Sequence, residues 1–144
     1  MLRAVSIIGY VGMVGGCVAL LLTQCLFSLN PLVIVLQLAA LWLGGWARIT
    51  FGRRSFHVVA NPTTGGLVTT GPYRLIRHPI YTAVSLFVLA GAAAHASWSA
   101  AGWGALVLAG ALVRMLCEEK LLVAMYPAYS QYAATNWRMI PYVF

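Results

Sequence analysis

Acidic side chains are almost absent from this 144-residue sequence, which has only two of them against nine lysines and arginines. Charged residues of both signs make up 8% of the chain, whereas 62% of the residues are hydrophobic and the mean hydropathy is +0.87. A soluble globular domain typically carries about 25% charged residues, so this composition excludes one. The sequence instead predicts a single integral membrane domain spanning residues 1–144.

Cysteine and histidine are also scarce, with three of each. The cysteines are odd in number, lie in apolar stretches and form no Cys-x-x-Cys pair, which argues against a disulfide framework and a zinc site. The histidines are far apart in the sequence. We therefore expect no metal site. The sequence also lacks a glycine-rich phosphate loop between a strand and a helix, which disfavours a nucleoside triphosphate as ligand.

The net charge of +7 does not predict nucleic-acid binding, because the basic residues gather at particular ends of the apolar segments. Five arginines bracket the connection between the second and third segments, whereas the connections at 28–30 and 95–99 contain no lysine or arginine. The positive-inside rule then places the basic residues and both termini on the cytoplasmic side of the inner membrane. Attraction to anionic lipid headgroups explains the charge.

Four apolar segments approach the roughly 20 residues that a helix needs to cross the hydrocarbon core. We expect an all-α fold whose four transmembrane helices lie near 4–28, 31–51, 79–96 and 99–121. Asn30-Pro31 predicts a tight turn, so the first two spans should form an antiparallel hairpin. The long polar connection at 50–77 is predicted to be a cytoplasmic loop that serves as a lid or binding element. Residues 127–136 are expected to form a short interfacial helix.

Small residues form a stripe along one face of the first predicted span, at Gly9, Gly12 and Gly16. Such stripes let membrane helices approach closely. The stripe could pack within one chain or between copies, so the sequence leaves the oligomeric state open.

Both acidic residues, Glu118 and Glu119, are adjacent near the end of the fourth predicted span. Ionisable groups at a membrane edge are costly and are therefore functional candidates. Arg114 lies four residues before Glu118 and shares its helical face, while Glu119 points about 100° away. We expect Arg114 to neutralise Glu118 and to leave Glu119 available. Arg77 and His78 precede the third span, where unpaired backbone N–H groups attract anions.

Several motifs occur in a recognisable order along the second half of the chain. They are Leu67-Val68-Thr69-Thr70-Gly71-Pro72-Tyr73-Arg74, Arg77-His78-Pro79-Ile80-Tyr81, Arg114 with Glu118-Glu119, and Tyr129, Tyr132 and Ile140-Pro141. Together they resemble the isoprenylcysteine carboxyl methyltransferase family and its relatives, the membrane phospholipid methyltransferases, over about residues 48–144. The resemblance implies a helical membrane enzyme that uses S-adenosylmethionine to methylate a lipophilic acceptor, which could be a carboxylate, an amine or a thiol.

The chemistry of S-adenosylmethionine fits these residues. Arg77 or His78 suits its carboxylate, and either glutamate suits its ammonium group. Tyr73 or Tyr81 could lie against the adenine or the sulfonium. Arg114 and Glu118 are the candidates for catalysis, because Arg114 could orient an anionic acceptor and a glutamate could deprotonate an amine or thiol. The predicted cofactor site therefore consists of Tyr73, Arg77, His78, Pro79, Tyr81, Glu118 and Glu119.

Two other interpretations stay open. Membrane sterol reductases look similar in this carboxy-terminal region and use a nicotinamide instead of a methyl donor. A small helical membrane protein without catalytic activity could use the same charges only to anchor helix ends and to pair with one another. In each case the expected surroundings are membrane lipids, with no nucleic acid as partner.

Overall fold

The computed structural model describes residues 2–52 and 66–144. In these ranges the chain forms α1 (Leu2–Leu22), α2 (Pro31–Phe51), the short 3-10 helix η2 (Gly71–Arg74), α3 (Pro79–Ala94), α4 (Trp98–Met125) and α5 (Tyr129–Thr135). No strand occurs in the described ranges, which confirms the all-α prediction for them. Part of the polar connection that the sequence predicts to be a lid lies outside the described residues, including Arg53, Arg54 and His57.

Three of the helices, α1, α2 and α4, are long and apolar enough to cross a membrane. α3 is also apolar but has 16 residues. At about 1.5 Å per residue it is shorter than the roughly 30 Å of a hydrocarbon core. The structure therefore shows three helices of spanning length, and the fourth span stays a prediction.

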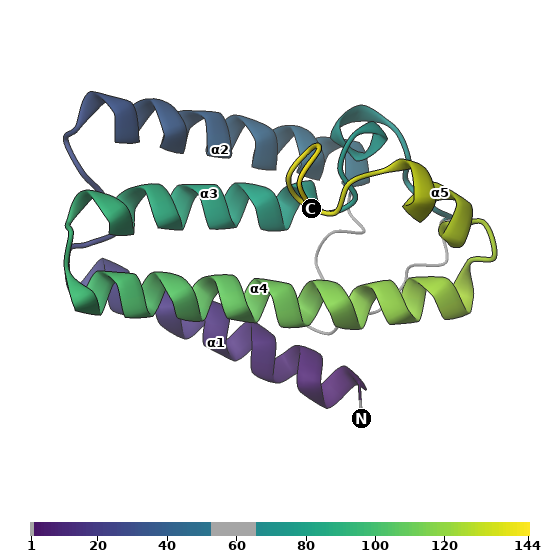
Figure 1. The fold of residues 1–144 in the computed structure, drawn as a ribbon, viewed down its shortest axis with the longest axis horizontal. Coiled ribbons are helices and arrows are strands. Elements are labelled where there is room, and N and C mark those ends of the chain that lie inside the picture. The colour runs from purple at the N-terminus through teal and green to yellow at the C-terminus, as the bar shows by residue number, and fades with distance from the viewer. Residues whose placement is uncertain (1, 53–65) are drawn as a thin grey trace.

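The helices pack in the order α2, α3, α4, α1 (Figure 1). α1 packs along α4, and α2 packs along α3. The first two helices therefore do not pack against each other as the predicted hairpin. α1 and α2 instead lie on opposite sides of the α3 and α4 pair, so residues of α1 reach α4 directly.

α1 ends at Leu22 rather than near residue 28, so the predicted end of this helix was wrong. The Cys25 N–H bonds back to the last turn at 2.8 Å, and Gln24 has a φ of 59°. This left-handed capping turn closes the helix. Gln37 on α2 then donates from Nε2 to the Leu26 carbonyl at 2.8 Å and holds the unwound segment. The sequence gives this end only a weak signal, because the polar residues Thr23 and Gln24 are followed by the apolar residues Cys25, Leu26 and Phe27.

α4 is longer than predicted, because it continues to Met125 instead of ending near residue 121. Pro127 is the first residue after Glu119 that cannot continue a helix. α5 begins at Tyr129, within the segment that the sequence predicts to be a short helix. The short connection between these two helices turns the chain back toward the start of α3 (Figure 1).

Glycines bring α1 and α4 into close contact. A Cβ atom added to Gly9 would lie 2.9 Å from the Gly110 carbonyl oxygen, and one added to Gly16 would lie 2.7 Å from Val107 Cγ2. A Cβ on Gly110 would lie 2.5 Å from the Gly9 carbonyl oxygen. These separations are too short for real carbon contacts, so the helices approach this closely only because glycine stands there. Gly9 and Gly16 of the stripe thus pack within the chain.

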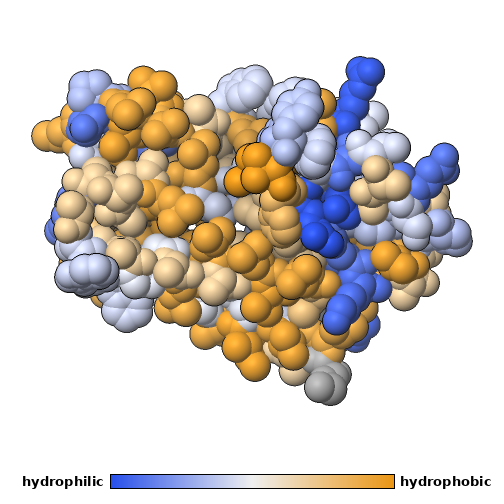
Figure 2. Space-filling view, in the orientation of Figure 1, coloured by the Kyte–Doolittle hydropathy of each residue, from blue (hydrophilic) through white to orange (hydrophobic). Residues whose placement is uncertain are grey.

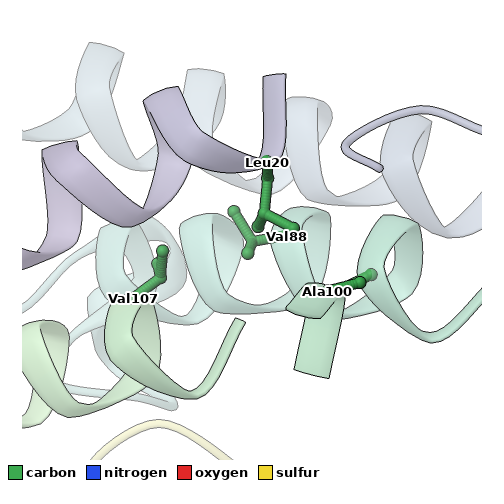
Figure 3. Close-up of a cluster of buried hydrophobic side chains, with 5 residues drawn as sticks. Leu20, Val88, Ala100 and Val107 are labelled. Carbon is green, nitrogen blue, oxygen red and sulfur yellow. The ribbon is translucent and has the colours of Figure 1, made fainter. Parts of the chain in front are cut away.

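A hydrophobic cluster joins α1, α3 and α4, near the end of α1 and the start of α4 (Figure 3). Its fully or almost fully buried members are Leu20, Val88, Ala92, Ala100 and Val107. Burial of each large apolar side chain stabilises the bundle by about 1.5–3 kcal/mol where water is the reference solvent. The cluster fixes α3 against α4 and thereby sets the spacing of the residues at the end of the bundle.

Charged side chains gather at one end of the bundle, where α1 and α3 begin and α2 and α4 end (Figure 2). The connections at the other end, residues 23–30 and 95–97, contain no lysine, arginine or acidic residue. Basic residues at the charged end include Arg3, Arg48, Arg74, Arg77 and Lys120.

Candidate functional site

The candidate site lies at the charged end, between the start of α3 and the last turns of α4. Gly71 has a φ of 57°, and a Cβ there would lie 2.6 Å from Thr50 Oγ1. Glycine therefore lets η2 pack against the last turn of α2. Pro79 occupies the first turn of α3, where its missing N–H costs nothing, and His78 is the N-cap. The backbone thus places His78 at the boundary between the helix and the connection before it.

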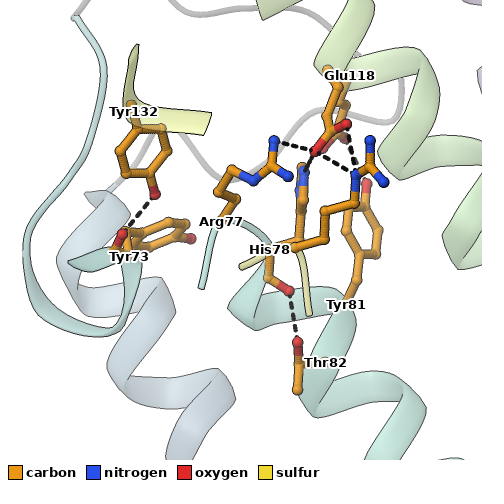
Figure 4. Close-up of polar contacts among 9 residues, drawn as sticks. Tyr73, Arg77, His78, Tyr81, Thr82, Glu118 and Tyr132 are labelled. Carbon is orange, nitrogen blue, oxygen red and sulfur yellow. Dashed lines mark hydrogen bonds and ion pairs between the residues drawn. The ribbon is translucent and has the colours of Figure 1, made fainter. Parts of the chain in front are cut away.

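Three basic side chains converge on Glu119. Its carboxylate lies 2.9 Å from Arg77 Nη1, 3.2 Å from His78 Nε2 and 3.1 Å from Arg138 Nε. The Glu119 side chain is only 11% exposed. The expectation that Glu119 stays available was therefore wrong, because three basic residues from two separate segments already surround it. Figure 4 shows Arg77 and His78 pointing toward the carboxylates of α4.

Glu118 is the more accessible carboxylate, with a side chain that is 27% exposed. Arg114 Nη2 lies 3.5 Å from it in the predicted i,i+4 pair, and the Tyr81 hydroxyl donates to it at 2.5 Å. Arg114 Nε donates in turn to the Tyr81 oxygen at 2.9 Å. Tyr81, Arg114 and Glu118 therefore form one hydrogen-bonded group beside the Glu119 cluster.

The geometry brings both carboxylates, the three predicted basic side chains and Tyr81 to one place. A model of the phospholipid methyltransferase family matches residues 26–129, more than half of the 144 residues. The chain belongs to the phospholipid methyltransferase family. The resemblance inferred from the motifs is confirmed at this level. No curated protein and no solved structure matches the chain at a significant level.

Membership in this family, together with the three apolar helices, identifies the protein as an integral membrane methyltransferase. The match contains η2, α3 and α4, and so it contains every site residue that the sequence predicted. It ends at residue 129. The residues of the last segment that contact the site, Trp137 and Arg138 among them, lie beyond this bound.

The segment after α5 packs against one side of the candidate site. The backbone N–H groups of Arg77 and His78 donate to the carbonyls of Trp137 and Arg138 at 2.7 and 2.9 Å. Asn136 Nδ2 donates to a carbonyl of η2 at 2.5 Å. Sequence reasoning missed Asn136 and treated Arg138 only as a topological charge, because no local pattern links them to residues so far away in the chain.

Tyrosines surround the connection that carries Arg77. Tyr132 donates from its hydroxyl to the Tyr73 carbonyl at 2.6 Å (Figure 4). Burial raises the pKa of the Tyr129 phenol to about 12; the nearby Glu119 charge also raises it, and Arg77 opposes the shift. Burial likewise raises the pKa of Tyr73 and Tyr132 above the ordinary value of 10.0. These phenols therefore stay protonated at neutral pH and can donate hydrogen bonds.

Two buried polar atoms at the site, Arg77 Nε and the Tyr129 hydroxyl oxygen, make no hydrogen bond of good geometry among the described residues, although the hydroxyl lies near Arg77 and Glu119. A buried donor without a partner typically costs about 1–3 kcal/mol. Both atoms can donate to an anion. The donor set therefore fits the carboxylate of an amino-acid-like ligand such as S-adenosylmethionine, while Glu118 fits its ammonium group.

Proposed function

We propose that this protein transfers a methyl group from S-adenosylmethionine to a lipophilic acceptor at the cytoplasmic face of the inner membrane. The observation that carries the proposal is the adjacency of a partly exposed carboxylate, Glu118, and a basic pair, Arg77 and His78, in a member of the phospholipid methyltransferase family. An amino-acid moiety carries the two opposite charges that such a site would recognise.

Each predicted cofactor residue has a place in the proposal. Arg77, with Tyr129, would hold the carboxylate of the methyl donor, and Glu118 would hold its ammonium group. Tyr73 and Tyr81 would lie against its adenine or sulfonium. His78 and Glu119 would keep Arg77 oriented, and Pro79 would set the start of α3 beneath them. When bound, S-adenosylmethionine would supply an electrophilic methyl group.

The chain's own contribution to the reaction is chiefly orientation. Holding a nucleophile in line with a methyl group can remove roughly 7–11 kcal/mol of the barrier without a covalent intermediate. A carboxylate acceptor needs no general base. For an amine or thiol acceptor, the Glu118 oxygen that does not face the ammonium group of the donor would accept the proton, and Arg114 would hold Glu118 and Tyr81 in place.

The charge distribution supports a topology in which α1, α2, α3 and α4 all span the membrane with both termini in the cytoplasm. The basic side chains lie at the end where α1 begins and α4 ends. A lipophilic acceptor would then reach the site from the bilayer, while the donor would come from the cytoplasm. Cysteine labelling of variants at residue 28 and residue 133 from either side of sealed vesicles tests this topology.

Calorimetry with S-adenosylhomocysteine on the detergent-purified protein tests the choice of cofactor. We expect saturable binding, and we expect transfer of labelled methyl groups into a lipid extract. Saturation by NADPH without a response to S-adenosylhomocysteine would instead favour the reductase. Absence of affinity for both ligands, unchanged by His78→Ala, would favour a protein without catalytic activity.

A further inference from the structure

Tyr10 on α1 contacts the candidate site from outside the family match, which begins at residue 26. The Arg114 guanidinium lies over the Tyr10 ring, with 5.0 Å between Cζ and the ring centroid. A cation within about 6 Å of a tyrosine face is attracted by the negative potential of the ring. The attraction is stronger where water is excluded, and Arg114 is only 5% exposed.

The close packing of α1 on α4 explains why Tyr10 reaches this position. Tyr10 directly follows Gly9, whose backbone touches Gly110, and Gly110 is one helical turn before Arg114. A larger residue at either glycine would move the ring away from the guanidinium. The first helix therefore contributes a side chain to the site as well as apolar packing.

Arg114 connects Tyr10 with the groups proposed to act on the ligand. Its Nε donates to the Tyr81 hydroxyl at 2.9 Å, and its Nη2 lies 3.5 Å from Glu118. The ring of Tyr10 thus restricts the same guanidinium that orients Tyr81 and the accessible carboxylate. Any rotation of Arg114 away from Tyr10 would change the position of both partners.

We propose that Tyr10 is a positioning residue that holds the Arg114 guanidinium in the orientation required for methyl transfer. The ring, and not the hydroxyl, carries this role, because the contact is to the aromatic face. The expected effect on activity rests on the proposed function. The contact between Tyr10 and Arg114 can be tested separately, by thermal unfolding.

The first experiment compares Tyr10→Phe with Tyr10→Leu in the full chain. Tyr10→Phe keeps the ring, and we expect it to retain activity within about twofold of the unsubstituted protein. Tyr10→Leu keeps an apolar side chain without a ring, and we expect about a three- to tenfold lower kcat, with the KM for S-adenosylmethionine changed by less than about twofold. Equal activity of the two variants would overturn the proposal.

The second experiment is a double-mutant cycle of Tyr10→Leu with Arg114→Gln, followed by thermal unfolding in detergent. If Tyr10 acts through Arg114, Tyr10→Leu lowers the Tm of the unsubstituted protein but has a smaller effect once Arg114 is replaced. Additive effects would reject the coupling. Failure of the unsubstituted protein to bind S-adenosylhomocysteine or transfer methyl groups would count against the proposed function, and the cycle would still decide whether Tyr10 holds Arg114.

Discussion

Replacing the two glutamates one at a time should separate their roles. In Glu119→Gln the side chain keeps its size but loses the charge that faces Arg77, His78 and Arg138. Removing one partner of a buried ion pair typically costs about 3–5 kcal/mol, because the other partner stays buried and uncompensated. The contact with Arg138 adds little, because that side chain is 38% exposed and exposed pairs contribute about 0–1 kcal/mol.

Glu118→Gln is the matched control, since it makes the same chemical change one residue earlier. Its side chain is 27% exposed, whereas its partner Arg114 is buried, so we expect a loss in the free energy of unfolding that is smaller than that of Glu119→Gln. Its effect on S-adenosylhomocysteine affinity should be the larger one, about tenfold or more, if Glu118 contacts the ammonium group.

Denaturant unfolding in a fixed detergent gives the stabilities of both variants, and calorimetry gives the affinities. The structure predicts that Glu119→Gln chiefly lowers stability and that Glu118→Gln chiefly lowers affinity. The reverse order, with Glu118→Gln the less stable protein, would refute the conclusion that Glu119 is the carboxylate that holds the basic side chains of the site together.

Three further predictions concern the surroundings of the site. Arg138→Gln should weaken S-adenosylhomocysteine binding by no more than about fivefold, measured by calorimetry, because this exposed cation only supports the Glu119 cluster. Gly110→Ala should destabilise the bundle by about 1–3 kcal/mol through overlap with α1, whereas Gly102→Ala, with no atom within 4 Å of the added Cβ, should be neutral in the same unfolding assay. Burial raises the pKa of Tyr129 to about 12 from 10.0, so the folded state binds its proton more tightly. The contribution of this phenol to the free energy of unfolding should be fully present below pH 10 and be lost as the pH rises toward 12. In Tyr129→Phe the free energy of unfolding should therefore fall less steeply over this pH range.

Local signals in the sequence were sufficient to predict α2. Asn30 caps this helix by accepting a hydrogen bond from the Leu32 N–H at 2.9 Å, and Pro31 stands at its first position. The end of α1 has no comparable signal. It depends on a left-handed turn at Gln24 and on a hydrogen bond from α2 to the unwound segment, and the local sequence shows neither.

The site shows the same division between local and long-range information. The spacing of Arg114 and Glu118 predicted their pairing, because both residues belong to one helix. The accessibility of Glu119 could not be predicted, since it depends on how α3 and the segment after α5 dock against α4. Tyr10 gave no signal at all, because its contact with Arg114 requires the close approach of two helices that are distant in the chain.

The hydrogen bonds between Trp137 or Arg138 and the backbone before α3 also affect the order of biogenesis. The three helices of spanning length, α1, α2 and α4, are translated before these two residues, so they can insert into the bilayer before the last segment docks against the start of α3. Membrane insertion and completion of the site are therefore separate events. A newly inserted chain therefore gains the hydrogen bonds that hold the backbone of Arg77 and His78 only after translation has passed Arg138.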